Sequence, residues 1–329
     1  MKEYVINSAD EGQTLLKYLE KVLPGAKGGV VFKALRKKNI VLNGGKATGK
    51  EVLKERDSVK VFFSDEVIES FKPKFGKDAA KVSVKKEELK RFKKNIVFED
   101  TNILIVNKDA DLLSQSDGSG SISLNDMLLS YLENEVKHYA VKPSVCNRLD
   151  RNTSGLVLCG KTQKGLKALS EVIKDRSLKK YYYAIVLGEL KGKLELKGYL
   201  HKDKEKNMAE ITEDKRYEDS DPVETIAEKE GKIRIKNYDL TLLKVQLVTG
   251  KPHQIRAHLL HAGYPVLGDM KYFTEDSRAC SETLSIKRQM LHAFRVEFPK
   301  MDKEFSSISG KSFEAELKDD MKSLLKYRV

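Results

Sequence analysis

Residues 147–155 read Asn147-Arg148-Leu149-Asp150-Arg151-Asn152-Thr153-Ser154-Gly155, and an apolar run, Leu-Val-Leu-Cys, follows at 156–159. A short apolar run next to turn-forming residues predicts a fully buried strand. Asp150 is therefore expected at the entrance of this strand, held by the flanking guanidinium groups of Arg148 and Arg151 and by the Thr-Ser-Gly turn. An arginine in contact would keep the carboxylate ionised at neutral pH. The arrangement is typical of a poised acid.

Residues 148–155 resemble the catalytic signature of the RluA family of RNA pseudouridine synthases, H-R-L-D-x-x-T-S-G. The chain departs from that pattern at Asn147, where the family most often has histidine. The resemblance implies an isomerase that converts particular uridines of RNA to pseudouridine. It also implies that Asp150 is the catalytic residue, acting as nucleophile or base.

Residues 179–188, Lys-Lys-Tyr-Tyr-Tyr-Ala-Ile-Val-Leu-Gly, predict a strand with Tyr182, Ala184 and Val186 on one face. The segment is similar to the family pattern K-x-Y-x-A-x-V-x-G, which selects Tyr182. The resemblance implies that Tyr182 stacks on the target base and assists proton removal from carbon 5. A flipped uracil loses its stacking neighbours, so an aromatic partner suits it. Periodicity alone favours an ordinary half-buried sheet residue, because aromatic residues are common in strands.

Residues 248–269 resemble T-G-R-x-H-Q-I-R-x-H-L followed by G-x-P-x-x-G-D. Pro252 and Gly263 are placed to start and end a helix. The resemblance implies that Arg256 pairs with Asp150. Lys251 stands where the family has arginine, which keeps the charge of a phosphate contact but loses the bidentate fork. Residues 288–293 resemble R-Q-x-L-H-A before the last strand, and their apolar positions are expected in the core. The candidate RNA-binding residues are Arg148, Arg151, Lys251, His253, Lys37 and Lys38.

Three histidines, His253, His258 and His261, raise the alternative of a metal site. His258 and His261 are three positions apart with no carboxylate at a matching helical position, and H-E-x-x-H is absent. Surface or hydrogen-bonding histidines are favoured over zinc ligands. We expect no cofactor. The sequence also lacks a P-loop and a G-x-S-x-G elbow.

The chain has 329 residues and a formal net charge of +13, which favours an anionic partner. Its length suits about two domains. No apolar run approaches the ~18 residues of a membrane span, and the N-terminus lacks the apolar core of a signal peptide, so we expect a cytoplasmic protein. The cysteines, Cys146, Cys159 and Cys280, lack C-x-x-C spacing and are expected to be reduced and structural. No heptad seam is present, so a monomer is expected.

Residues 1–65 predict two helices, a strand, a tight turn and a closing strand. This order resembles the S4-like RNA-binding domain of a small-subunit ribosomal protein, although an ordinary solvated module would look the same. Residues 66–94 are expected to be a basic linker, because 71–94 hold ten Lys or Arg against three acids. Such a run would either contact phosphates or serve as a flexible spacer.

Residues 95–329 alternate short strands with occasional helices and lack regular crossover helices. This pattern predicts an α+β catalytic domain built on a mixed, largely antiparallel sheet with flanking helices. Expected strands cover 96–100, 102–108, 156–159, 178–187, 194–199, 223–227 and 238–248, and expected helices cover 123–135 and 163–174.

The N-terminal module favours large-subunit (23S) ribosomal RNA or pre-ribosomal particles as the substrate over transfer RNA, which stays an alternative. The departures at Asn147 and Lys251 motivate a second alternative, a noncatalytic RNA-binding protein of ribosome assembly. A chain freed from chemistry need not keep Asp150, Tyr182 and Arg256 together. A third alternative, a hydrolase using the histidines, would require a metal.

Overall fold

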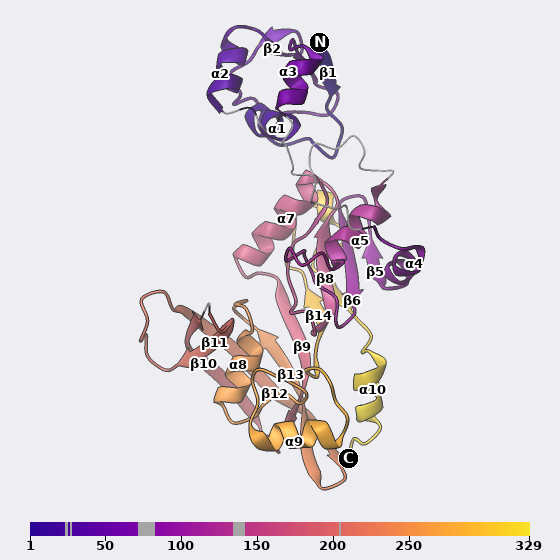
Figure 1. Ribbon diagram of the computed structural model, residues 1–329, viewed down its shortest axis with the longest axis vertical. Helices are drawn as coiled ribbons and strands as arrows, with labels where there is room; N and C mark the ends of the chain where they lie inside the picture. The colour runs from indigo at the N-terminus through magenta and orange to yellow at the C-terminus, as the bar shows by residue number, and fades with distance from the viewer. Residues whose placement is uncertain (24–25, 27, 72–82, 134–141, 204) are drawn as a thin grey trace.

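The computed structural model describes residues 1–23, 26, 28–71, 83–133, 142–203 and 205–329 (Figure 1). The N-terminal unit is a four-stranded antiparallel sheet in the order β1-β4-β2-β3, with two helices packed on it. Leu15, Leu19, Leu35 and Val59 are fully buried between them. The two helices, the strand, the turn and the closing strand follow in the predicted order, but β1 before them and the short β3 were not predicted. Pro24 and Gly25, expected to end the first helix, lie outside the described residues. The elements are β1 (Lys2–Val5), α1 (Leu15–Val22), α2 (Gly28–Arg36), β2 (Ile40–Leu42), β3 (Gly45–Lys46) and β4 (Ser58–Val61).

The segment expected to be a linker contains two helices, α3 (Asp65–Ser70) and α4 (Lys86–Lys94). Phe92 of α4 is 2% exposed and its ring lies 5.4 Å from that of Tyr131, between ring centroids. The last part of the predicted basic linker, 66–94, is therefore a helix with an apolar anchor in the core of the larger unit. Its exposed lysines are Lys86, Lys90, Lys93 and Lys94.

The larger unit is built on an eleven-stranded sheet. Nine strands follow the order β11-β10-β12-β13-β9-β14-β8-β6-β5, while β15 pairs with β14 and β7 with β8. Every pair is antiparallel except β8 with β14. The mixed, largely antiparallel α+β sheet is confirmed. The strands are β5 (Ile96–Glu99), β6 (Ile103–Lys108), β7 (Ser144–Val145), β8 (Ser154–Gly160), β9 (Lys179–Leu187), β10 (Lys193–Asp203), β11 (Met208–Thr212), β12 (Asp221–Ile235), β13 (Tyr238–Leu247), β14 (Leu291–Glu297) and β15 (Ser312–Glu314).

Helices cover both faces of this sheet. One core contains side chains of α5 (Leu124–Tyr131) and α8 (Gln254–His261) packed on Tyr182, Ala184 and Val186 of β9. On the other face, Ile185 packs with side chains of α9 (Glu275–Thr283) and α10 (Asp319–Leu325), and a further cluster contains α7 (Gln163–Lys174) and η1 (Lys303–Phe305). The alternation predicted for β9 is confirmed. In the described part of the chain, no helix is long and apolar enough to cross a bilayer.

The parallel contact of β8 with β14 positions the loop that carries Asp150. Gly155 has φ +116°, and a Cβ there would collide with the main chain of Ala293. Glycine is therefore required where the two strands meet. Asp150 precedes this contact and lies at the entrance of the buried strand, as predicted.

Candidate active site

Asp150 is joined to Arg256, which lies in the first turn of α8, 106 positions further along the chain. Arg256 Nη1 donates to Asp150 Oδ2 at 2.8 Å. The other two nitrogens of the guanidinium group donate to Asp269, Nε to Oδ2 at 2.6 Å and Nη2 to Oδ1 at 2.8 Å. The structure thus contains the expected pair and adds Asp269 as a second carboxylate.

Burial differs across this three-residue cluster. The side chains of Arg256 and Asp269 are 7% and 0% exposed, whereas that of Asp150 is 26% exposed. Burial alone would lower the pKa of the Arg256 guanidinium, but the two carboxylates raise it above its ordinary value. The pair with Asp269 is therefore internal support, and Asp150 is the member that a solvent-borne substrate can reach.

The arginines that flank Asp150 in sequence do not hold it. Arg151 Nε pairs with Asp111 Oδ1 at 2.9 Å, and Arg148 is exposed. The expectation that they hold the carboxylate is wrong, because the partner comes from α8. Asn147, at the departure from the family pattern, accepts from Leu158 N–H at 2.7 Å and fastens the loop to β8.

Tyr182 is buried in the core next to the loop, at 6% exposure. Burial, and after it the charge of Asp150, raises the pKa of its hydroxyl. The group therefore stays a neutral proton donor at neutral pH. Tyr183 points to the opposite face, where it stacks on Phe294 with ring centroids 3.8 Å apart.

His253 lies on the other side of the Asp150 carboxylate. Its Nε2 is 4.0 Å from Asp150 Oδ1, and its Nδ1 is 2.9 Å from the hydroxyl oxygen of Tyr272. Burial lowers the pKa of His253, although Asp150 opposes the shift. The backbone is left-handed, with φ +58°, so α8 starts at Gln254 rather than at Pro252. Left-handed non-glycine residues are strained by about 1–3 kcal/mol and cluster at functional sites.

The remaining predicted RNA contacts lie at the surface. Lys251 Nζ pairs with Asp221 Oδ2 at 2.6 Å, with the lysine side chain 35% exposed. Lys37 and Lys38 are exposed just after α2 in the N-terminal unit. His258 turns inward, with Nδ1 2.8 Å from Thr225 Oγ1. Among the described residues, no three His, Cys, Asp or Glu side chains form a group that could hold a metal ion.

Lys108, which was not among the predicted site residues, contacts the loop that carries Asp150. Its side chain is fully buried, and its Nζ donates to the carbonyls of Asp109 at 2.8 Å, Leu112 at 2.8 Å and Arg151 at 3.0 Å. Burial lowers its pKa to about 7. Its signal in the sequence is a lysine two positions after the apolar run at 103–106, at the end of β6. The bond to Arg151 pins the residue next to Asp150.

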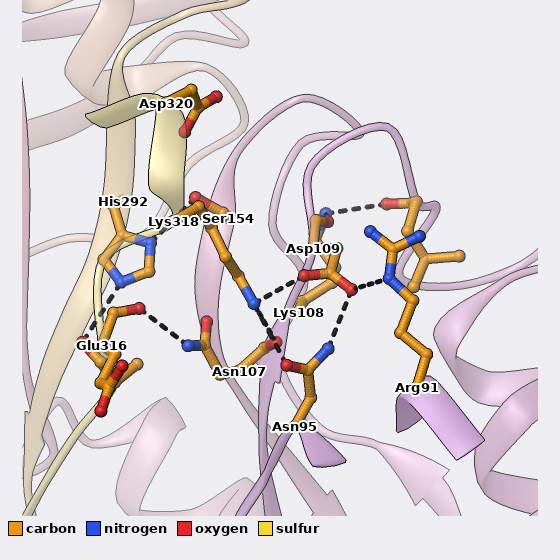
Figure 2. A network of polar contacts seen from close by, with 12 residues as sticks. Arg91, Asn95, Asn107, Lys108, Asp109, Ser154, His292, Glu316, Lys318 and Asp320 are labelled. Carbon is orange, nitrogen blue, oxygen red and sulfur yellow. Dashed lines mark hydrogen bonds and ion pairs between the residues drawn. The ribbon is translucent and has the colours of Figure 1, made fainter. Parts of the chain in front are cut away.

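A second polar network surrounds the carboxylate of Asp109, the residue after Lys108 (Figure 2). The carboxylate of Asp109 accepts from Arg91 Nε at 2.7 Å, Asn95 Nδ2 at 2.8 Å and Lys318 Nζ at 2.6 Å. Lys318 also donates to the carbonyl of Asn107 at 3.1 Å. These contacts connect α4 and the C-terminal segment to the end of β6. The helix in the predicted linker therefore belongs to the structure that supports the site.

Comparison with known proteins places this geometry in a family. A sequence model described as RNA pseudouridylate synthase matches residues 102–261, which include Asp150, Tyr182 and Arg256. An RNA pseudouridine synthase of Mycoplasma genitalium is 30% identical over 308 residues, covering 91% of this chain and 90% of that protein. The chain belongs to the RNA pseudouridine synthase family. It is an isomerase, and the enzyme class expected from the sequence is confirmed.

A further relative and a solved structure are also similar to the synthase. The ribosomal large subunit pseudouridine synthase C of Pasteurella multocida is 28% identical, covering 91% of this chain and 86% of that protein. The structure of human RNA pseudouridylate synthase domain containing 4 matches with a TM-score of 0.56 at 18% identity, covering 73% of this chain and 94% of that chain. This likeness shows that the synthase has the same fold.

Three side chains of the synthase site were not assigned a role from sequence: Lys108, Asp269 and Tyr272. Asp269 is the aspartate of the G-x-P-x-x-G-D segment, whose pattern carried no role for that residue. Gly268 before it has φ +77°, and a Cβ there would collide with the carbonyl of Arg288. This glycine allows the chain to turn so that the Asp269 carboxylate contacts Arg256.

Proposed function

We propose that this synthase isomerises specific uridines of large-subunit (23S) ribosomal RNA and that Asp150 is its catalytic residue. The observation that carries the proposal is the Asp150 carboxylate itself: Arg256 holds Oδ2 at 2.8 Å, while the side chain remains 26% exposed. Relatives named ribosomal large subunit pseudouridine synthase C, from Pasteurella multocida and Haemophilus influenzae, are 28% identical over at least 91% of this chain and support the choice of substrate.

The reaction breaks the bond between ribose carbon 1′ and uracil N1, turns the base, and joins carbon 1′ to carbon 5. The hydrogen of carbon 5 is lost and N1 gains a proton. Asp150, whose Oδ2 is held by Arg256, would act through Oδ1 as a nucleophile at the sugar or base, or as the base that takes a proton. The hydroxyl of Tyr182 would assist at carbon 5 as a proton relay: its oxygen takes the hydrogen of carbon 5 while its own proton passes to an acceptor such as the Asp150 carboxylate. Its ring would lie close to the rotated uracil.

The target uridine has to leave its stack, which costs a few kcal/mol of stacking and pairing. Phosphate contacts would offset that cost. We assign them to Arg148, Arg151 and Lys251, and we place His253 among the RNA-binding residues of the site. Arg151 and Lys251 now pair with Asp111 and Asp221, but exposed pairs contribute little, so a phosphate could replace either carboxylate.

The domain assignment is part of the proposal. Residues 1–65 would form an S4-like RNA-binding domain that uses Lys37 and Lys38. Residues 95–329 would form the catalytic domain, with α4 as an added helix because Phe92 is buried in the same core. The exposed lysines of α4 then lie on the catalytic domain and extend its positive surface.

Carbodiimide and primer extension would test the substrate. Ribosomal and transfer RNA from cells with and without the gene are compared, and pseudouridines appear as stops. A stop that disappears from large-subunit RNA without the gene supports the proposal. Loss confined to transfer RNA would overturn the substrate. Unchanged stops, together with no isomerisation by the purified protein, would favour a noncatalytic assembly protein.

A further inference from the structure

Tyr272 is a buried side chain that contacts the groups on both sides of Asp150. It is 1% exposed, and its main-chain N–H donates to Asp269 Oδ1 at 3.0 Å. Its ring centroid lies 4.8 Å from Arg256 Cζ. The same ring meets the His253 imidazole edge to face, with centroids 5.6 Å apart and planes at 76°. One tyrosine thus packs against both the arginine and the histidine of the site.

The hydroxyl of Tyr272 has two polar contacts in the part of the chain that the structure describes. It accepts the N–H of Ala209, in β11, at 2.5 Å, and it lies 2.9 Å from His253 Nδ1. Burial raises the pKa of Tyr272, so the hydroxyl keeps its proton at neutral pH. A buried hydroxyl places its proton on an acceptor, and His253 Nδ1 is the acceptor within reach.

This bond decides which nitrogen of His253 carries hydrogen. A neutral imidazole has one N–H, and the other ring nitrogen is an acceptor. If Nδ1 accepts from Tyr272, the hydrogen is on Nε2. Nε2 faces Asp150 Oδ1, the oxygen that Arg256 does not hold, across 4.0 Å. That separation is too long for a direct hydrogen bond, so the N–H stays available to a ligand.

We propose that Tyr272 is a positioning residue that fixes His253 as the Nε2–H tautomer, so that this N–H donates to an oxygen of the uridine bound against Asp150. The identity of that ligand rests on the proposed function. Uracil carbonyls and ribose hydroxyls both accept hydrogen bonds. The left-handed backbone of His253 fits this role, because the residue is held at the start of α8 in a conformation that its side-chain contacts must stabilise.

The tautomer can be measured in the RNA-free full-length protein by long-range ¹H–¹⁵N correlation after ¹⁵N-histidine labelling. The chain has six histidines, and His253→Gln identifies the resonance. We expect a protonated Nε2 and an unprotonated Nδ1 in the wild type, and loss of this single form in Tyr272→Phe. A protonated Nδ1 in the wild type would overturn the inference without the need for any variant.

Turnover gives the second readout. Tyr272→Phe should lower the single-turnover rate about tenfold, the effect of roughly one hydrogen bond, with RNA affinity unchanged. Loss of the bond to neutral His253 raises its pKa, so the pH at which this imidazole gains its second proton, followed through its ¹⁵N resonances, should move upward. The matched control is Tyr131→Phe. This variant loses a 2.9 Å hydrogen bond from the tyrosine hydroxyl to Glu99, away from the site, and should change neither the rate nor the pKa of His253.

The role of Tyr272 and the proposed function can be overturned separately. A Tyr272→Phe enzyme with the wild-type rate and pH profile would overturn the role of Tyr272 while leaving the synthase proposal intact. A wild-type protein that isomerises no uridine, but shows the Nε2–H tautomer, would overturn the proposed function and leave the Tyr272 hydrogen bond standing.

Discussion

Replacing Arg256 by lysine keeps the positive charge of the site but removes its geometry. The guanidinium makes three contacts at once, one to Asp150 at 2.8 Å and two to Asp269 at 2.6 and 2.8 Å. A lysine ammonium is a compact point charge without the planar fork. It will pair with Asp269, whose side chain is 0% exposed and would otherwise be a buried unpaired charge. Asp150 will then have water in place of the guanidinium group.

The size of the effect follows from the contact that is lost. A hydrogen bond to a charged group contributes about 1.5–3 kcal/mol. Loss of the one that aims Asp150 should slow the chemical step about 10- to 150-fold. The free energy of unfolding should change little, because the buried charge pair survives. Arg256→Gln should instead destabilise the fold by about 3–5 kcal/mol, since it leaves Asp269 unpaired.

Tritium release measures the chemical step, because carbon 5 loses its hydrogen. Purified enzymes are mixed in excess with ribosomal RNA labelled at carbon 5 of uridine, and the single-turnover rate is compared. Arg295→Lys is the matched control, because Arg295 also joins two carboxylates, Glu297 at 2.8 Å and Glu314 at 3.1 Å, away from the site. A rate for Arg256→Lys equal to that of the control would refute the reasoning.

Three further outcomes are expected. Tyr182→Phe should slow tritium release roughly 10²- to 10⁴-fold, the range of general acid–base catalysis, while the RNA affinity measured by filter binding stays unchanged. A loss of affinity without a loss of rate would mean that Tyr182 stacks on the base and takes no part in proton transfer. Lys108→Met should lower the free energy of unfolding in urea by about 3 kcal/mol, because three carbonyls lose the hydrogen bonds from the buried ammonium group; an unchanged urea midpoint would contradict this. Burial lowers the pKa of His258 and of His292 to about 4. The unfolded chain, with histidine pKa values near ~6.5, then binds more protons, so stability falls as the pH drops from about 6.5 to about 4; equal unfolding free energies at pH 7.5 and pH 5 would be inconsistent with buried neutral histidines.

Local sequence signals predicted much of the fold. The apolar run after Gly155 became β8, and the helix expected at 163–174 matches α7, where Thr162 caps the first turn. Helix α4 was not predicted, because lysines dominate its composition, while one aromatic residue, Phe92, packs it on the core. Helix α9 was not expected, because Cys280 is its main buried apolar side chain.

The candidate site divides in the same way. Asp150 and Arg256 came from sequence motifs, and the structure brings them into contact. Contacts between distant segments carry no local signal, so the grip of Asp269 on Arg256 and the bond of Tyr272 to His253 could not be predicted. The misplaced role of Arg151 has the same origin. Adjacency in sequence suggested a partner for Asp150, but the turn directs Arg151 to Asp111.

The most direct test of the central claim is complementation of a gene deletion with the wild-type protein or with Asp150→Ala, followed by carbodiimide mapping of large-subunit ribosomal RNA. Both proteins must accumulate to equal levels, which immunoblotting checks. We predict that the wild type restores the lost pseudouridine stop and that Asp150→Ala does not. A stop restored by Asp150→Ala would show that another group performs the isomerisation.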